Sequence, residues 1–230
     1  MNKQIKMVVF DMAGTTVNED NVVYKTLRNT INQAGFDFSL DEVLIQGAGK
    51  EKKHAIRSVL LVYGGIANEV LTEQIYSSFI KQLTDAYVSA PIAPQPDAKA
   101  LLTALKEQDI LTVLNTGYDR KTAQLIIDKM GWTSGVDFNL LVTASDVGKN
   151  RPDPGMILLA MDQLGITESV SVVKVGDSII DIEEGKNAGC GLTVGITTGA
   201  HTAEQLASAN PDLVIDNLLE LLPLIAQYQA

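Results

Sequence analysis

Four apolar segments of the sequence each lead into polar residues that could carry out phosphoryl-transfer chemistry. A carboxylate can attack phosphorus or bind a divalent cation, a hydroxyl can donate to a phosphoryl oxygen, and a cation can offset their charge. These residue types occur shortly after the segments, at Asp11, at Thr116 with Gly117 and Tyr118, at Lys149 and Arg151, and at Asp177 with Asp181. Together they would bind a phosphoryl group and a divalent cation.

The stretch VVFDMAGTT at residues 8–16 raises a question about this chemistry. Asp11 follows the apolar run and precedes a turn of small residues, an arrangement that presents a nucleophile or a metal ligand. A phosphoryl-transfer site of this shape usually has a second carboxylate two residues later, where this chain has Ala13. General acid–base help is worth about 10²–10⁴ in rate, so the leaving group must be stabilised in another way.

The elements that position these residues alternate between strands and helices. Short apolar runs predict strands at residues 5–10, 110–116, 138–145, 171–177, 191–197 and 212–216. Helices are predicted between the later strands, and such alternation favours an α/β fold, a Rossmann-like doubly wound parallel sheet. Ligands bind outside the carboxyl ends of strands in such a sheet, so we expect the polar residues to gather there.

Residues 17–90 differ from the rest of the chain because their pattern is helical throughout. We predict an α-helical cap domain over 17–90, inserted after the first strand, and a sheet core formed by 1–16 and 91–230. No strand is predicted between residues 17 and 109. Three prolines in the segment APIAPQP indicate the linker that leads back into the core.

The composition limits the class of protein. The 230 residues carry a formal net charge of -10, which disfavours nucleic acid as a partner. The single cysteine, Cys190, leaves no intrachain disulfide, and this fits a cytoplasmic protein. No apolar run is long enough to cross a membrane, and the N-terminal residues lack a signal-peptide pattern. His54 and His201 are expected at the surface rather than at a metal.

Four motifs, in this order, resemble the haloacid dehalogenase superfamily, in the branch with a helical cap inserted after the first strand. They are DMAGTT at 11–16, LNTGY at 114–118, RPDP at 151–154 and GDSIID at 176–181. Within the superfamily, the alanine in DMAGTT together with NTGY and RPDP resembles the phosphonatases, which hydrolyse phosphonoacetaldehyde. The usual phosphatases of the superfamily have aspartate where Ala13 stands.

The resemblance implies a nucleophile and a metal site. Asp11 would attack phosphorus and become an aspartyl phosphate. Mg²⁺ would be held by Asp11, by the backbone carbonyl of Ala13 and by Asp177, a set of hard oxygen ligands that suits this ion. Asp181 would stand behind these ligands without binding the ion.

The resemblance also implies how the phosphoryl group is held. Thr116 would donate its hydroxyl to a phosphoryl oxygen, helped by the amide of Gly117. Arg151 would offset the charge of the phosphoryl group and of Asp11, since the RPDP motif favours it over Lys149. Tyr118 would line the substrate pocket or pack beneath it.

Finally, the resemblance offers an explanation for Ala13. Phosphonatases form a Schiff base between a cap lysine and the substrate aldehyde, so that the C–P bond breaks to leave an enamine. In QGAGKEKKHAI the family's glycine and lysine correspond to Gly47 and Lys50, with Gly47 beside the substrate. Neighbouring cations would lower the pKa of Lys50, namely Lys52, Lys53 and Arg57. Alternatively, Lys50 reads substrate charge or is a solvated residue at a helix start.

The sequence thus predicts a Mg²⁺-dependent phosphonatase-like hydrolase that acts on phosphonoacetaldehyde or a close relative. One alternative is a phosphatase for a small phosphorylated metabolite. A second is a non-catalytic phosphate-binding protein of the same fold. A small-molecule phosphonate or phosphate is the expected partner, and the apolar helix around 57–66 could form a homodimer contact.

Overall fold

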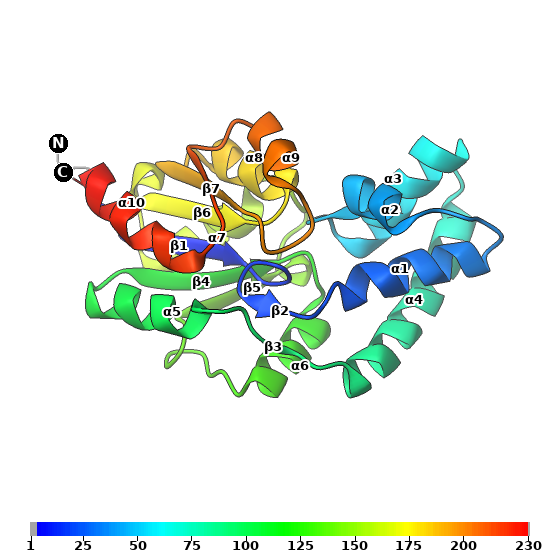
Figure 1. Cartoon of the computed structure of the whole chain (residues 1–230), viewed down its shortest axis with the longest axis horizontal. Helices are drawn as coiled ribbons and strands as arrows, with labels where there is room; N and C mark the ends of the chain where they lie inside the picture. The colour runs from blue at the N-terminus through cyan, green and yellow to red at the C-terminus, as the bar shows by residue number, and fades with distance from the viewer. Residues whose placement is uncertain (1–3, 230) are drawn as a thin grey trace.

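The computed structural model describes residues 4–229 and contains a six-stranded parallel sheet with helices on both faces (Figure 1). Its strands are β1 (Met7–Asp11), β4 (Leu111–Thr116), β5 (Leu140–Thr143), β6 (Val172–Gly176), β7 (Leu192–Ile196) and β8 (Leu213–Ile215). They lie in the order β5-β4-β1-β6-β7-β8. The chain fills one side of β1 and then the other, which places the topological switch point at β1. The predicted α/β, Rossmann-like fold is confirmed.

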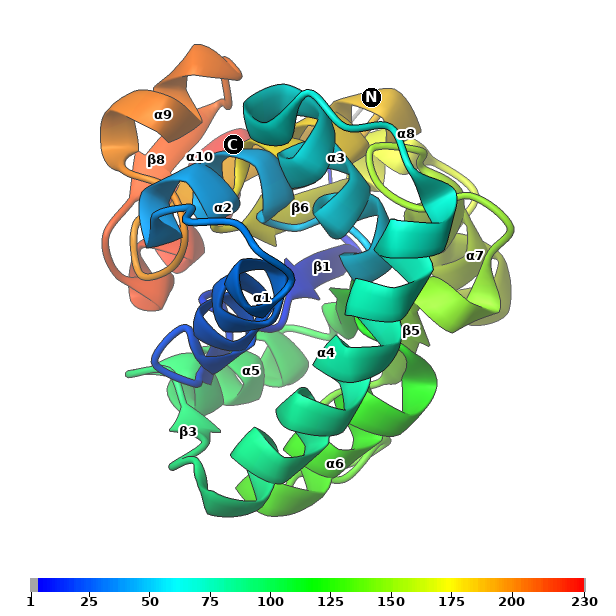
Figure 2. The ribbon, with the colours of Figure 1, turned by 90° about the vertical axis from the view of Figure 1, so that its right-hand side faces the viewer.

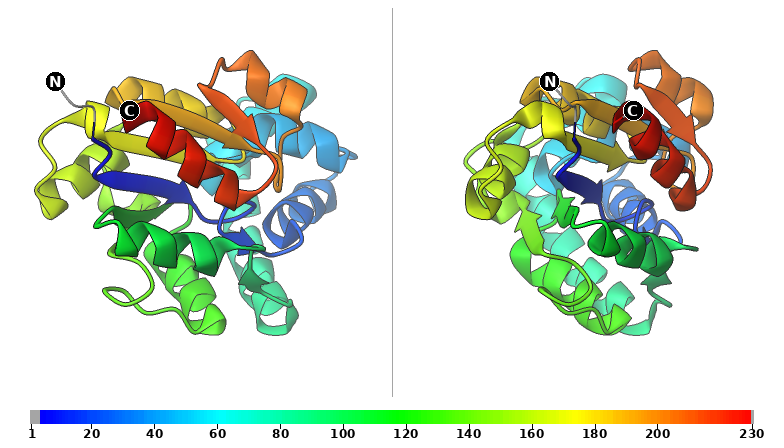
Figure 3. Two further views of the ribbon diagram at one scale, coloured as in Figure 1. Left: turned by 60° about the vertical axis from the view of Figure 1, so that its left-hand side comes forward. Right: turned by 90° about the vertical axis from the view of Figure 1, so that its left-hand side faces the viewer.

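The two faces of the sheet are covered by different helices because successive side chains of β1 point to opposite sides. Val8 and Phe10 belong to the core that includes α5 (Ala98–Glu107) and α10 (Leu221–Gln229), seen in front of the sheet in Figure 3. Met7 and Val9 pack in the core that includes α7 (Gly155–Leu164) and the end of α8 (Ile179–Ala188). All four side chains are fully buried, each contributing about 1.5–3 kcal/mol of hydrophobic free energy.

Four helices between β2 and β3 form a separate layer, called here the helical segment (residues 22–89). They are α1 (Val22–Gln33), α2 (Leu40–Gly47), α3 (Lys52–Gly64) and α4 (Glu69–Ser89). Contacts of α1 with α4, α2 with α3 and α3 with α4 hold the layer together. Figure 2 looks from this layer toward the sheet, with β1 behind it, so the helical segment lies at the carboxyl ends of the strands.

Local capping signals set the helix starts in this segment. Ser39 and Glu42 form a reciprocal capping box at the start of α2. The carboxylate of Glu51 accepts from the amides of Lys53 and His54 at the start of α3. These caps determine where the loop between α2 and α3 lies, and that loop reaches the core.

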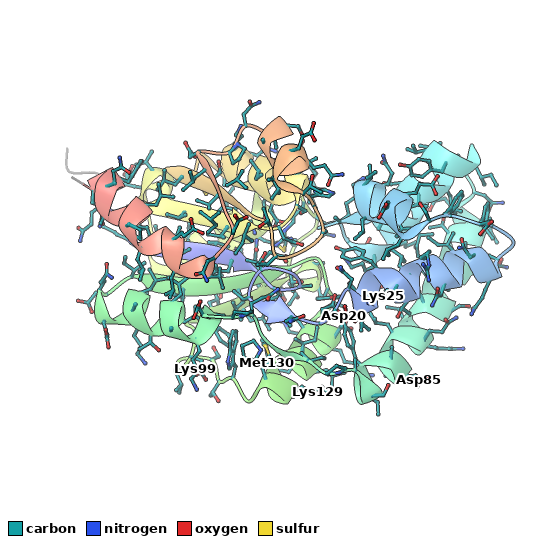
Figure 4. All side chains as sticks on the ribbon, in the orientation of Figure 1. Asp20, Lys25, Asp85, Lys99, Lys129 and Met130 are labelled. Carbon is teal, nitrogen blue, oxygen red and sulfur yellow. The ribbon has the colours of Figure 1, made fainter. Side chains whose placement is uncertain are left out.

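A short antiparallel pair joins the two connections between the core and the helical segment. It consists of β2 (Val17–Asn18) and β3 (Ala93–Pro94). The prediction that no strand lies between 17 and 109 is therefore wrong, because a two-residue strand is too short to show periodicity. Lys129, at the end of α6 (Arg120–Met130) and visible in Figure 4, donates to the carbonyls of Tyr87 and Val88. This contact ties the end of α4 to the core.

The remaining elements are short. They are α9 (Ala203–Ser208) and three single 3₁₀ turns at Ala144–Asp146, Ser169–Ser171 and Leu218–Glu220. Across residues 4–229, no helix has both the length and the apolar character needed to cross a membrane.

Candidate active site

The carboxyl group of Asp11 is fixed at the end of the central strand. Asp11 lies opposite Asn115 in the β1–β4 register. The next turn folds tightly, since the amides of Thr15, Thr16 and Val17 all donate to one carbonyl, that of Met12. The Thr16 hydroxyl also donates to the carbonyl oxygen of Asp11, at 2.9 Å. The predicted nucleophile thus stands at the switch point of the sheet.

Arg151 is only 1% exposed, and its guanidinium contacts three carboxylates of the site. Its Nη1 lies 2.6 Å from Asp11 Oδ1 and 2.9 Å from Asp181 Oδ1, and its Nε lies 2.9 Å from Glu184 Oε2. Its Nη2 donates to the backbone carbonyl of Asn115 at 3.0 Å. Burial opposes the charge, yet these carboxylates outweigh it and raise the pKa of Arg151, so the group is a permanent cation.

Lys174 is a second buried cation that the sequence analysis missed. Its Nζ lies 2.7 Å from Asn115 Oδ1, 3.0 Å from Asp181 Oδ1 and 3.3 Å from Glu184 Oε2. A lysine inside the apolar run SVVKVGD is the signal that could have found it, because a charge in a buried strand requires a partner.

We call the following residues the core carboxylate cluster: Asp11, Asn115, Arg151, Lys174, Asp177, Asp181 and Glu184.

Asp177 is held differently from the other acids of this cluster. Its Oδ2 accepts from the amide of Ala200 at 2.6 Å, and within residues 4–229 no cation forms an ion pair with it. Gly14, at φ +83°, and Gly199 line its carboxylate so closely that a Cβ on either would lie within 2.3 Å of Oδ2. Burial, with Asp11 and Asp181 nearby, raises the pKa of Asp177 well above its ordinary value.

The carboxylates at this end of the sheet fit a divalent cation. One oxygen each from Asp11, Asp177 and Asp181 lie within 4.8 Å of one another. The core carboxylate cluster has four carboxyl groups against two cations, so full ionisation leaves two negative charges that a divalent ion would neutralise. Burial opposes ionisation of Asp181, but Arg151 and Lys174 lower its pKa, whereas Asp177 lacks such compensation. The residues present can hold a divalent metal.

The end of β4 supplies the predicted phosphoryl contacts beside Asp11. Thr116 is buried, and its Oγ1 accepts from the amide of Tyr118 at 3.2 Å, which leaves the hydroxyl proton to donate elsewhere. Gly117 lies under the α2–α3 loop, where a Cβ would be 2.9 Å from the carbonyl oxygen of Lys50. A Cβ on Gly49, in that loop, would lie 2.2 Å from Ile180 Cγ2 and 2.4 Å from Ser178 Oγ. These two glycines let the helical segment touch the core.

The structure does not bring Gly47 and the amine of Lys50 to this place. A Cβ on Gly47 would meet Ala55 and Leu27, which are both inside the helical segment. The Lys50 Nζ donates to Ser58 Oγ at 3.2 Å and is half-buried, and burial lowers the pKa of this amine. The backbone of Lys50 lies at Gly117, and the charge of Glu183 on α8 partly offsets the effect of burial on its amine.

Lys52, which the sequence analysis treated as a helper, is the lysine buried between the two layers. It is 7% exposed, and its Nζ donates to the carbonyl of Lys50 at 3.0 Å and to the Tyr24 hydroxyl at 3.4 Å. The ammonium also lies 4.8 Å from the ring centre of Tyr24 and 5.3 Å from that of Tyr118. Burial lowers the pKa of Lys52, partly offset first by Asp11. The negative charge of Asp11 therefore favours the protonated form of this amine.

A cavity of about 190 Å³ opens beside this lysine, between the helical segment and the core. Its walls include Glu51, Lys52, Tyr76, Phe79, Ile80, Leu83, Gly117, Tyr118, Asp119, Ala144 and Ser145. Asp11 does not line this cavity, whereas Lys52 does. The charge of Asp11 affects the pKa of Lys52. The volume suits a small molecule.

Buried titratable groups surround Lys52, and of these Tyr118 was expected at the pocket whereas Glu19, Tyr24 and Tyr87 were missed. We call Glu19, Tyr24, Lys52, Tyr87 and Tyr118 the boundary cluster, and all five are buried. No pattern in the sequence distinguishes Glu19, Tyr24 and Tyr87, because they come from different elements and meet only after the helical segment packs on the core.

The expectation that His201 is a surface residue is wrong. The ring is 5% exposed, its Nδ1 accepts from the amide of Ile179 at 3.0 Å, and it also bonds the backbone of Leu44. His201 thus links α2 to the start of α8. A lone histidine in a loop shows no signal of such a contact in the sequence.

Comparison with known proteins places these features in context. The model of the family described as haloacid dehalogenase-like hydrolase matches residues 8–194. A phosphonoacetaldehyde hydrolase of Latilactobacillus sakei is 30% identical, and the alignment covers 98% of this chain and 96% of that protein. A phosphonoacetaldehyde hydrolase-like protein of Oleispira antarctica has a similar structure, with TM-score 0.83 and 23% identity, covering 98% of this chain and 92% of the other.

A phosphatase structure shares the fold as well. The putative phosphoglycolate phosphatase of Lactobacillus delbrueckii aligns with TM-score 0.80 at 17% identity, covering 96% of this chain and 98% of the other. The fold by itself therefore does not separate the two activities.

Proposed function

The chain belongs to the haloacid dehalogenase-like hydrolase family, and we propose that it is a Mg²⁺-dependent phosphonatase-like enzyme. It would cleave the C–P bond of phosphonoacetaldehyde or a close relative through an aspartyl phosphate on Asp11. The helical segment would act as a cap domain, residues 17–90, that excludes water from the core domain of 1–16 and 91–230. The similarity to phosphonoacetaldehyde hydrolases along nearly the whole chain supports the substrate class.

Residues at the strand ends would hold and activate the phosphoryl group. Asp11 attacks phosphorus, while Thr116 and the amide of Gly117 donate to phosphoryl oxygens. Arg151 orients Asp11 through the 2.6 Å contact and partly offsets the burial that raises the pKa of this carboxyl. These roles are positioning and electrostatic stabilisation, which dominate phosphoryl transfer.

The metal would bind between an acid of the first motif, Asp11, and an acid of the fourth motif, Asp177. Asp11, the Ala13 carbonyl and Asp177 would hold Mg²⁺, which supplies charge neutralisation at the phosphoryl oxygens when bound. Asp181 is engaged by Arg151 and Lys174 and would remain behind these ligands.

The observation that carries the proposal is a buried amine, that of Lys52, at the wall of the cavity in a chain that has Ala13. Without a carboxyl at position 13, the leaving carbon needs another way to accept electrons, and an iminium formed by a buried lysine supplies it. We expected Lys50 from the sequence, whereas the geometry favours Lys52, because its side chain is buried rather than half-buried and it lines the cavity.

The test compares two conservative variants. Acetaldehyde and phosphate release from phosphonoacetaldehyde with Mg²⁺ is measured for the parent, Lys52→Arg and Lys50→Arg. Borohydride trapping followed by peptide mass mapping locates any imine. We expect Lys52→Arg to lose turnover and trapping while Lys50→Arg keeps both. The reverse result assigns the imine to Lys50.

A phosphatase remains the second candidate, because the contacts of Lys52 also suit an ammonium that reads substrate charge. That function predicts release of phosphate from esters by Lys52→Arg and no borohydride adduct. Phosphate binding without turnover of any substrate would instead support the non-catalytic alternative.

A further inference from the structure

A chain of hydrogen bonds runs from Glu19 to the wall of the cavity. The Tyr87 hydroxyl donates to Glu19 Oε2, and the Tyr87 and Tyr118 hydroxyl oxygens are 2.7 Å apart. Tyr118 lines the cavity beside Lys52. The three members come from the connection after β2, from α4 and from the loop after β4, so the chain spans both layers of the molecule.

Backbone contacts hold each member in place. The carbonyl of Tyr87 accepts from Lys129, and the carbonyl of Tyr118 accepts from the Ala144 amide at 3.1 Å. Glu19 Oε2 also accepts from the Val23 amide at 3.3 Å. The side chains of Glu19, Tyr87 and Tyr118 are at most 3% exposed, so water does not interrupt the chain.

The groups that face Glu19 leave its proton mobile. They are Tyr87 on α4, Tyr118 after β4, Tyr24 on α1 and Lys52 on α3. Burial raises the pKa of Glu19 to about 7, although the Tyr87 and Val23 hydrogen bonds and the Lys52 charge lower it. A carboxyl that exchanges its proton near neutral pH is suited to general acid–base catalysis.

The protonation of Glu19 sets the direction of the chain. When Glu19 is ionised, Tyr87 donates to it and Tyr118 donates to Tyr87. When Glu19 carries a proton, it donates to Tyr87, Tyr87 donates to Tyr118, and the Tyr118 proton is free to enter the cavity.

We propose that Glu19, acting through Tyr87 and Tyr118, supplies the proton for the leaving group and so replaces the carboxyl that is absent at Ala13. Tyr118 is the group that touches the substrate, and Glu19 and Tyr87 are positioning residues behind it. The inference rests on the proposed function for its substrate but concerns residues that the proposed function does not use.

The proton balance of the two half-reactions is complete. When phosphorus passes to Asp11, the C–P electron pair becomes the C=C bond of the enamine, and the iminium C=N pair moves to nitrogen. The C=C pair of the enamine then forms a C–H bond with the Tyr118 proton while the nitrogen lone pair restores C=N, and water hydrolyses this iminium to acetaldehyde and the lysine ammonium. Tyr118 takes a proton from Tyr87, and Tyr87 takes one from Glu19, which becomes ionised. Water then opens the aspartyl phosphate, and the proton that it releases returns to Glu19.

The test separates proton delivery from structure by varying the leaving group. Single-turnover release is measured for the parent, Glu19→Gln and Tyr87→Phe, with phosphonoacetaldehyde and with p-nitrophenyl phosphate, whose phenolate leaves without a proton. We expect both variants to slow acetaldehyde release by about 10²–10⁴ and nitrophenol release by less than about threefold. Asp20→Asn is the matched control, because Asp20 is the adjacent, exposed acid visible in Figure 4.

The pH profile provides the second readout. Acetaldehyde release by the parent should fall as pH rises through about 7, since the donor must be protonated, and this limb should be absent in Glu19→Gln. Equal losses on both substrates with a lowered Tm, or an unchanged limb, would overturn the proposal.

Failure of the proposed function has a different signature. If the parent releases no acetaldehyde, a series of phosphate monoesters from aryl to alkyl alcohols replaces the substrate. The relay then predicts that the Glu19→Gln defect grows with the basicity of the leaving alcohol, and a constant ratio, or no turnover at all, refutes it.

Discussion

Two buried sets of charged groups lie within this molecule, and they handle charge in opposite ways. In the core carboxylate cluster, Asp11, Asp181 and Glu184 are paired with Arg151 or Lys174 at 2.6 to 3.3 Å, whereas Asp177 has no such partner in residues 4–229. In the boundary cluster, the carboxyl of Glu19 and the amine of Lys52 are each bonded to neutral partners, including the hydroxyls of Tyr87 and Tyr24.

The difference shows how burial can either fix a charge or make it variable. Burial opposes the ionisation of Asp181, but its pairing with both Arg151 and Lys174 lowers its pKa, whereas Arg151 only partly offsets the burial that raises the pKa of Asp11. A hydrogen bond from a neutral hydroxyl does not offset the free energy lost when a charged group is desolvated. Burial therefore raises the pKa of Glu19 and lowers that of Lys52. The two cations of the core therefore hold the charge of Asp181, whereas at the boundary no ion pair in the part of the chain that the structure describes opposes the effect of burial on Glu19 and Lys52.

The largest expected effect comes from removing the nucleophile. Asp11→Asn should reduce turnover by at least about 10⁴, since no other group of the site can form the acyl phosphate. The fold should persist, because Arg151 keeps its contacts with Asp181 and Glu184. Phosphate-release assays and thermal unfolding measure the two outcomes, and residual turnover near the parent level would contradict the assignment.

The next effect tests whether the core cluster depends on its cation. Arg151→Met should lower the free energy of unfolding by about 3–5 kcal/mol, because it leaves buried carboxylates without their partner. Urea denaturation measures this, with the exposed Lys149→Met as control, for which a change within about 0.5 kcal/mol is expected. Equal stability of the two variants would show that the ion pairs do not support the fold.

A pH titration of stability tests the boundary cluster. The pKa of Glu19 is higher in the folded protein than its ordinary 4.5, so protonation favours folding and its contribution is lost as pH rises to about 7. At 1.36 kcal/mol per pKa unit, the expected loss is roughly 3 kcal/mol. Glu19→Gln should remove this part of the slope, and identical slopes for parent and variant would argue against a neutral Glu19.

Metal binding should follow the protonation of Asp177. Because its pKa is raised, Mg²⁺ must displace a proton, and affinity should increase with pH by up to about tenfold per unit. Calorimetry at several pH values, in buffers of different ionisation enthalpy, reports affinity and proton release together. Asp177→Asn should lose both, and turnover that survives chelation would remove the metal from the proposal.

The smallest effect concerns assembly. Leu61 and Val62 on α3 are 53% and 54% exposed, within the region 57–66 that we expect to form a homodimer contact. Light scattering should report a dimer that Leu61→Glu dissociates with little change in turnover, since the contact is remote from both clusters. A monomeric parent would exclude it.

Much of the core could be predicted because its information is local. The apolar runs gave the strands of the sheet to within a few residues, since a buried strand reads directly as such a run. Asp11, Thr116 and Asp177 were found because polar residues at strand ends converge in a parallel sheet. Arg151 needed the RPDP motif as well, because periodicity did not distinguish it from Lys149.

The boundary could not be predicted in the same way. Lys50 and Lys52 are both in one short basic run, and only the direction of each side chain after α3 packs on the core separates them. Glu19 and Tyr87 are 68 residues apart in the chain and meet through the packing of the helical segment. Lys174 could have been recognised, because a charged residue inside a predicted buried strand is unusual. The sequence analysis treated residues 171–177 only as an apolar run.

The sequence by itself determined the parallel sheet, the helical insertion and the set of acids at the strand ends, because hydrophobic period and strand-end position are properties of short segments. Tertiary structure alone decided which lysine is buried between the two layers and which carboxyl has its pKa raised to about 7. Those outcomes depend on desolvation and on partners from distant segments, and neither exists until the helical segment and the core exclude water between them.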